Sequence, residues 1–135
     1  MVNSKIEVFC DGGSRGNPGP SAAGVVIKTT EGKILGEYCE YLGIKTNNYA
    51  EYWAVILALQ KLHEMEIQKA DFYLDSMLVV QQLCGVYKVK HPDMKLLFDK
   101  VQALIEGIDL SFTHVLRAKN TEADAMVNQC LDANV

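Results

Sequence analysis

Four acidic residues of this chain occupy positions where a carboxylate is costly unless something compensates its charge. Asp11 and Asp75 each end an apolar segment. Glu51 lies inside a long apolar segment, and Asp124 opens another. Burying an ionised carboxylate without a partner strongly destabilises a fold. If the four acids converge, they repel one another unless divalent cations neutralise them, and such a centre suits phosphoryl transfer assisted by two metal ions.

Hydrophobic periodicity and turn residues predict the elements that must position these acids. Strands are expected over residues 4–11, 22–29, 33–43, 70–75 and 108–117, and helices over residues 49–64, 76–84, 93–105 and 120–131. A rigid turn rich in glycine and proline is expected over residues 12–20, and an irregular basic link over residues 86–92. This order predicts an α/β fold: a mixed five-stranded sheet, its first three strands antiparallel, flanked by helices on both faces.

The predicted fold gathers the acids at one edge of the sheet. Asp11 and Asp75 fall at the C-terminal ends of strands, where sites form in open α/β sheets. Glu51 and Asp124 lie on apolar helical stripes near the helix starts, so their side chains should point toward the sheet. Local roles are the alternatives: Asp75 could cap a helix, Asp124 could compensate a helix dipole, and Asp11 could open a turn. Glu51 lacks such a role, and the four together favour a shared metal site.

Composition sets further limits. The 135 residues, 49% hydrophobic and 22% charged, predict one globular domain over residues 1–135. The first residues lack the long apolar stretch of a signal peptide, and the four scattered cysteines predict free thiols, so we expect a cytoplasmic protein. The net charge of −4 is unusual for a protein that binds nucleic acid. Cations bound at the acids would reverse the local sign and explain part of that charge.

Four segments resemble the type 1 ribonuclease H family in their residues and in their order. They are DGGSRGNPGP at residues 11–20, TNNYAEYWAVILAL at 46–59, LDSMLVVQQL at 74–83 and HVLRAKNTEADAMVN at 114–128. The resemblance implies that the catalytic acids and metal ligands are Asp11, Glu51, Asp75 and Asp124. It also implies an endonuclease that uses two Mg²⁺ ions, with Mn²⁺ as a substitute, to cut the RNA strand of an RNA/DNA hybrid and leave 3′-hydroxyl and 5′-phosphate ends.

The resemblance further implies a set of contacts with the hybrid. The residues concerned are Gly12, Gly13, Ser14, Asn47, Gln81, Asn17 and Thr46. The first three would reach the RNA strand through backbone groups, because small side chains permit close approach. Asn47 and Gln81 match family positions that contact sugars and base edges. Asn17 and Thr46 match a pocket that binds a phosphate of the DNA strand. The alternatives are a plain turn for the glycines and a helix cap for Asn47.

Two departures from the family affect the predicted site. The basic helix-loop that some relatives use for substrate binding is missing, so Lys88 and Lys90 remain to contact phosphates, with ordinary solvated surface as the alternative. The loop before Asp124 is short, and Arg117 falls where many relatives place a histidine that assists proton transfer or product release. His114 lies within the predicted strand instead. We expect Arg117 to bind a phosphate there, because a guanidinium stays protonated and cannot act as a general acid.

Two other functions stay open at the level of sequence. One is a catalytically inactive nucleic-acid-binding module with the same fold, against which the four intact acids argue. The other is a different nuclease of the ribonuclease H-like superfold, although the GNPG turn and the TNN segment before the first helix favour ribonuclease H. The predicted partner is an RNA/DNA hybrid, with no membrane and no obligate protein partner.

Overall fold

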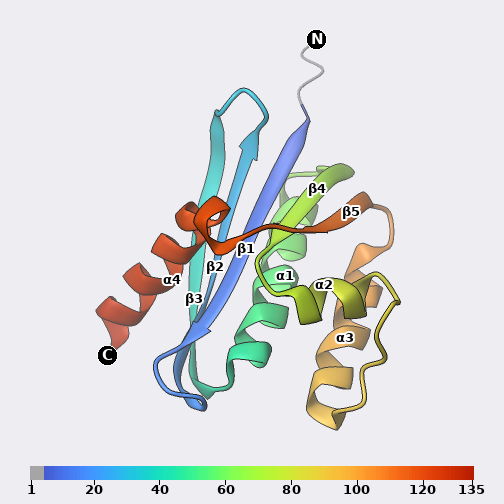
Figure 1. Cartoon of the computed structure of the whole chain (residues 1–135). Coiled ribbons are helices and arrows are strands. Elements are labelled where there is room, and N and C mark those ends of the chain that lie inside the picture. Colours follow the sequence, from blue (N-terminus) through green and yellow to red (C-terminus); the bar gives the residue numbers. More distant parts are fainter. Residues whose placement is uncertain (1–4) are drawn as a thin grey trace.

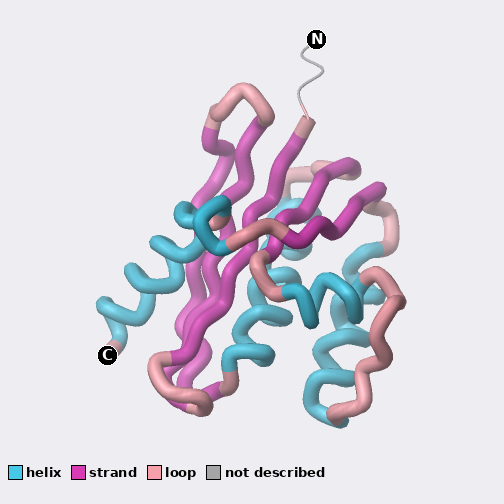
Figure 2. Tube along the Cα trace, in the orientation of Figure 1, coloured by secondary structure: helices cyan, strands magenta, loops and turns pink. Residues whose placement is uncertain are grey.

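The computed structural model describes residues 5–135 (Figures 1 and 2). Its strands are β1 (Ile6–Ser14), β2 (Gly19–Thr29), β3 (Ile34–Lys45), β4 (Lys69–Leu74) and β5 (Asp109–His114). Its helices are α1 (Asn47–Glu64), α2 (Met77–Leu83), α3 (Pro92–Ile105) and α4 (Thr121–Asn134), with a short 3₁₀ helix, η1, at Arg117–Lys119. Ser4, the expected first residue of the opening strand, lies outside the described residues.

The described strands form a mixed sheet in the order β3-β2-β1-β4-β5. β1, β2 and β3 pair antiparallel because short turns join them, whereas β4 and β5 pair parallel after helical crossovers. This arrangement confirms the predicted fold class. β1 lies at the centre of the sheet, so a residue near its C-terminal end can be approached from both faces (Figure 1).

Helices cover both faces of the sheet, as predicted. Side chains alternate along β2, so that Ala23 and Val25 pack in the core with α1, whereas Ala22 packs on the opposite face with α4. α1 contacts both the sheet and α3, and half of its 18 residues are buried. α4 packs across β1, β2 and β3 on the other face (Figure 1). Acids on α1 and on α4 lie on opposite faces of the sheet, so they can meet only at an end of its strands.

The first predicted boundary that is wrong concerns the glycine-rich turn. β1 continues through Gly12 and Gly13 to Ser14, which pairs with Ser21 of β2. Glycine tolerates an extended backbone as well as a turn, and here the ladder with β2 determines the outcome. Asp11 is consequently inside β1, although the parallel ladder between β1 and β4 stops one residue earlier, at Cys10.

The second wrong boundary concerns the last strand, which ends at His114 rather than at Arg117. β4 ends at Leu74, which pairs with His114, so β5 has no strand to pair with beyond that point. The backbone N–H of Val115 still donates to the Leu74 carbonyl at 2.8 Å, and the chain then leaves the sheet. Arg117 begins η1 instead of closing a strand.

Two of the remaining expectations concern chemistry and location. The cysteines are free thiols, as predicted, at Cys10, Cys39, Cys84 and Cys130. Across residues 5–135, every helix is too short or too polar to span a membrane. The cytoplasmic location stays a prediction.

Candidate active site

Three of the four predicted acids lie together at the carboxyl end of the parallel strands. Asp11, Glu51 and Asp75 each offer a carboxylate oxygen, and these oxygens all lie within 4.8 Å of one another. With Ser76 and two apolar neighbours they line a narrow recess. The three side chains come from β1, from α1 and from the segment after β4, so the tertiary fold is what brings them together.

The position of Asp75 follows from where β4 ends. Leu74 is the last residue of β4, and Asp75 is the first residue beyond it. The N-cap of α2 is Ser76, whose hydroxyl accepts a hydrogen bond from the Val79 N–H at 3.2 Å. Asp75 is therefore not the cap of α2, and the local alternative for this residue is wrong.

Gly12 lets α1 bring Glu51 beside Asp11. A Cβ atom at Gly12 would lie 2.2 Å from the carbonyl carbon of Ala50 and 2.3 Å from the backbone nitrogen of Glu51. No side chain fits between β1 and the first turn of α1, so the backbones lie in direct contact. Gly12 therefore has a packing role in addition to its predicted contact with substrate. No local sequence signal indicates this role, because the partner residue is 38 or more positions away in sequence.

Gly24 does the same for α4 on the opposite face. Gly24 pairs with Asp11 in the β1–β2 ladder, and a Cβ there would lie 2.5 Å from the Ala123 carbonyl oxygen. This close approach places Asp124 next to Asp11, where its carboxyl group adds to the rise in the pKa of Asp11 that burial and Asp75 cause. Asp124 is not among the three acids that share the 4.8 Å cluster, so it lies to one side, with Asp11 as the common neighbour.

Burial and mutual repulsion raise the pKa values of acids in the cluster. Asp11 is 7% exposed, and burial raises its pKa to about 9, with further increases from the charges of Asp75, Asp124 and Glu51. Burial likewise raises the pKa of Glu51 to about 7, although a hydrogen bond from Ser76 opposes the rise. Each carboxylate therefore makes its neighbours harder to ionise.

This donor set fits a divalent metal ion. Carboxylate oxygens are hard ligands that suit such cations, and a cation among them would relieve the mutual repulsion. Within the part of the chain that the structure describes, the Oδ2 atom of Asp75 is buried without a hydrogen-bond partner. An unpaired buried carboxylate oxygen is unfavourable in a purely structural role and available in a metal-binding one.

Arg117 lies close enough to Glu51 to affect its ionisation. Its positive charge lowers the pKa of Glu51, against the effect of burial. The backbone N–H group of Lys119 donates to the Leu116 carbonyl and that of Asn120 to the Arg117 carbonyl, and these two bonds close the turn of η1. His114, in contrast, is bound into the sheet as the last residue of β5.

Several predicted substrate-binding residues join the β1–β2 loop to the start of α1. The Ser14 N–H donates to the Asn47 Oδ1 at 2.8 Å, and the Asn47 N–H donates to the Asn17 Oδ1 at 3.1 Å. Thr46 is the N-cap of α1, because its hydroxyl accepts from the Tyr49 N–H at 3.2 Å. The helix-cap alternative for Asn47 is therefore wrong, and its side chain orients the loop instead.

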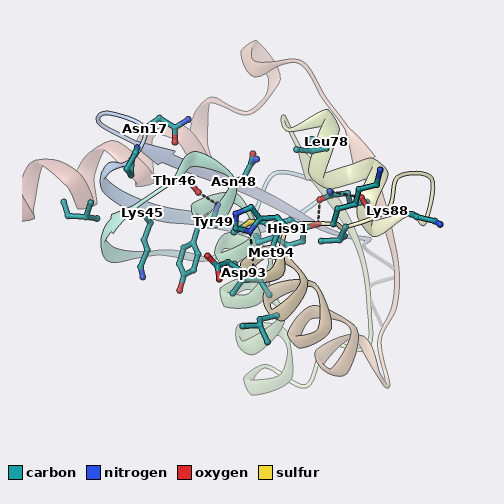
Figure 3. A pocket seen from close by; sticks show the side chains of 18 residues that line it. Asn17, Lys45, Thr46, Asn48, Tyr49, Leu78, Lys88, His91, Asp93 and Met94 are labelled. Carbon is teal, nitrogen blue, oxygen red and sulfur yellow. Dashed lines mark hydrogen bonds between the residues drawn. The ribbon is translucent and has the colours of Figure 1, made fainter.

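A groove of about 900 Å³ runs from this junction to the basic link (Figure 3). Asn17 and Thr46 lie on one side of it, and Lys88 and Lys90 line it from the link. Gln81 is not among the lining residues; its side-chain amide faces Met77 one turn earlier on α2. Four of the predicted contact residues thus share one groove, which borders the α1 turn that carries Glu51.

The chain is similar in sequence to a known family and to characterised relatives. The chain matches the reverse transcriptase-like family over residues 9–130. It is 40% identical to a ribonuclease HI of Halobacterium salinarum over 129 residues, which cover 95% of this chain and 65% of that protein. It is also 40% identical to the bifunctional protein Rv2228c of Mycobacterium tuberculosis, over 96% of this chain and 36% of that protein. The chain thus spans less than two thirds of the length of these relatives.

Solved structures agree with the sequence relatives. RNase H1 of Halobacterium salinarum has a TM-score of 0.92 and 39% identity, over 96% of this chain and 98% of that one. LC11-RNase H1, solved in complex with an RNA/DNA hybrid, has a TM-score of 0.91 and 41% identity, over 96% and 98% of the two chains. The shared fold, the coverage and the level of identity all point the same way. The chain belongs to the type 1 ribonuclease H family.

Proposed function

We propose that this chain is an endonuclease that hydrolyses the RNA strand of RNA/DNA hybrids and leaves 3′-hydroxyl and 5′-phosphate ends. The observation that carries the proposal is the cluster of Asp11, Glu51 and Asp75, whose carboxylate oxygens lie within 4.8 Å of one another. A neighbour of 41% identity that was solved with an RNA/DNA hybrid supports the choice of substrate. The chemistry of the cluster and the family of the chain lead to the same reaction.

The proposed metal ligands are the four acids, with Asp11 as the common neighbour of Asp75, Glu51 and Asp124. Mg²⁺ is the proposed ion, at two positions, with Mn²⁺ as a substitute, because hard oxygen ligands suit both. When bound, such ions activate the attacking water and stabilise the charge on the leaving oxygen. The high pKa of Asp11 means that the carboxylates bind a cation in competition with protons.

Arg117 is the proposed phosphate ligand of the site. A guanidinium forms charge-assisted hydrogen bonds with phosphate oxygens and keeps its proton at any working pH. Its position on the Glu51 side of the cluster suits a contact with the phosphate that is cut or with the departing product. His114, paired within the sheet, is the less suitable candidate for that role.

The substrate would lie across the β1–β2 loop and the groove. We assign the RNA strand to the backbone of Gly12, Gly13 and Ser14, and to Asn47 and Gln81. Discrimination against DNA requires such contacts near 2′-hydroxyl groups. The DNA strand is assigned to the groove through Asn17, Thr46, Lys88 and Lys90, which line it together. Few basic residues line this path, so hybrid binding should be weak and sensitive to salt.

An inactive binding module is the main alternative, and the acids argue against it. A protein that only bound nucleic acid would gain nothing from a buried Asp11 with a pKa near 9 and an unpaired Asp75 oxygen within the described chain. Both features destabilise the metal-free fold. A cation bound among the acids would compensate both features.

The test is cleavage of an end-labelled RNA/DNA hybrid in the presence of Mg²⁺, beside duplex DNA and duplex RNA of the same sequence. Internal cuts confined to the RNA strand of the hybrid, with 5′-phosphate and 3′-hydroxyl products, would support the proposal. Binding of the hybrid without cleavage would favour the inactive module. Cleavage of DNA, or digestion from an end, would favour another nuclease of the superfold.

A further inference from the structure

Asn120 connects α4 to β1 across almost the full length of the sequence. Its side-chain Nδ2 group donates to the Cys10 carbonyl at 2.8 Å, between residues 110 positions apart. The side chain is 1% exposed. Cys10 directly precedes Asp11 and is the last residue of β1 that pairs with β4. The hydrogen bond therefore holds the backbone at the point where the site begins.

The backbone of Asn120 binds two further segments of the site. Its N–H donates to the Arg117 carbonyl at 2.9 Å, which closes η1. Its carbonyl accepts from the Asp124 N–H at 3.1 Å, which forms the first turn of α4. One residue thus connects the segments that carry Asp11, Arg117 and Asp124.

The side chain does not serve its own helix. Asn120 is the N-cap of α4, a position where asparagine usually accepts a hydrogen bond from a free amide of the first turn. Across the described residues its side chain makes no such capping bond, and its Oδ1 atom is buried without a partner. Helix stability alone would favour the capping geometry. The observed geometry gives up the cap and connects the helix to β1.

Ala123 in the first turn of α4 lies directly against Gly24, and the remaining contacts of α4 with the sheet are less directional. Val127 and Leu131 pack against Ala22, and apolar packing of this kind is not directional. Lys28 pairs with Glu122 on the first turn, but this ion pair is partly exposed and such pairs stabilise little. The hydrogen bond from Asn120 is buried and directional, so it can set how far α4 slides and turns relative to β1.

We propose that Asn120 is a positioning residue that fixes Asp124 and Arg117 relative to Asp11. This role rests on the proposed function, because positioning matters for catalysis only if these residues catalyse. It assigns to Asn120 no contact with substrate or metal. The hydrogen bond from its side chain to the Cys10 carbonyl provides this positioning.

The test compares Asn120→Ala with Leu131→Ala, a control that weakens α4 far from its first turn. Steady-state cleavage of the hybrid gives kcat and KM, and hydrogen exchange of the metal-free protein gives the protection of the Asp124 amide. In Asn120→Ala we expect kcat to fall about tenfold to a hundredfold with KM nearly unchanged, as a misplaced group predicts. Protection of the Asp124 amide should fall with it. In Leu131→Ala, both should stay near wild type at a comparable loss of melting temperature.

Equal kcat losses in the two variants, or a normal kcat in Asn120→Ala, would overturn the proposal. If Asn120→Ala does not fold, Asn120→Ser is judged by the same readouts, because serine retains polarity but cannot reach the Cys10 carbonyl. If the wild-type protein does not cleave the hybrid, the proposed function fails on that result. The exchange experiment then decides the positioning role separately: retained protection of the Asp124 amide refutes it, and lost protection supports it.

Discussion

Gly12 offers the sharpest test of how the fold places the site. In Gly12→Ala the new methyl group would lie 2.2–2.4 Å from backbone atoms of Ala50 and Glu51. Ordinary contacts begin at 3.4 Å, so α1 must move by more than about 1 Å, since backbone atoms cannot rotate away. Overpacking of this kind should lower the free energy of unfolding by about 3 kcal/mol, or roughly 10 °C in Tm for a domain of this size.

The same displacement should reduce catalysis through Glu51. A shift of about 1 Å in a catalytic group is expected to lower kcat about a hundredfold, even where the protein stays folded. The assay is hybrid cleavage well below the Tm of the variant, with unfolding followed by circular dichroism. If Gly12 acted only by touching RNA, KM would rise and stability would stay unchanged.

Gly13→Ala is the matched control for stability. Its methyl group would lie 3.3 Å from the Val127 Cγ1, a side-chain atom that can yield by a few tenths of an ångström. We expect it to change the free energy of unfolding by less than about 1 kcal/mol. Equal stability of Gly12→Ala and wild type, or equal losses in the two variants, would refute the packing argument.

Three further predictions concern charge. The pKa of Asp11 is raised from its ordinary value of 3.8 to about 9, so the folded metal-free protein binds more protons than the unfolded chain. Thermal denaturation should therefore show stability falling from pH 4 toward pH 9, and Mg²⁺ should flatten that slope. A flat profile without metal would contradict this prediction. Arg117→Ala should lower kcat about tenfold to a hundredfold, the loss of one charged contact, whereas His114→Ala should act mainly on stability, and the reverse ranking in steady-state kinetics would return the role to histidine. Replacing Lys88 and Lys90 together by alanine should raise KM more than it lowers kcat and should reduce the salt dependence of binding, and an unchanged KM would show that the link does not touch the hybrid.

The sequence predicted the elements because their signals are local. Alternating and helical apolar patterns, the cap at Thr46 and the turn at Glu31 and Gly32 each lie within a few residues, and the element order then limits the sheet to few arrangements. Asp75 after a strand and Glu51 on a buried stripe follow from the same patterns. The three acids that the structure brings together were accessible to this reasoning.

What the sequence did not predict depends on contacts between distant segments. β5 ends early because β4 ends at Leu74, a fact about the neighbouring strand. The roles of Gly24 and Asn120 require knowing that α4 lies against β1 and β2, since both act on residues about 100 positions away. From the local sequence, Asn120 before a helix is predicted to be an ordinary N-cap, so no local signal identifies its hydrogen bond to Cys10.

The central claim is that the acid cluster performs the chemistry, and its most direct measurement is hybrid cleavage by Asp11→Asn and Asp75→Asn. Each variant keeps the size of the side chain and takes one carboxyl group, whose ionised form is unfavourable among the other acids, out of the cluster, so the metal-free fold should be intact or more stable. We predict that both variants bind the hybrid in the presence of Mg²⁺ and that neither cleaves it above background. Near-normal turnover by either variant would contradict the account.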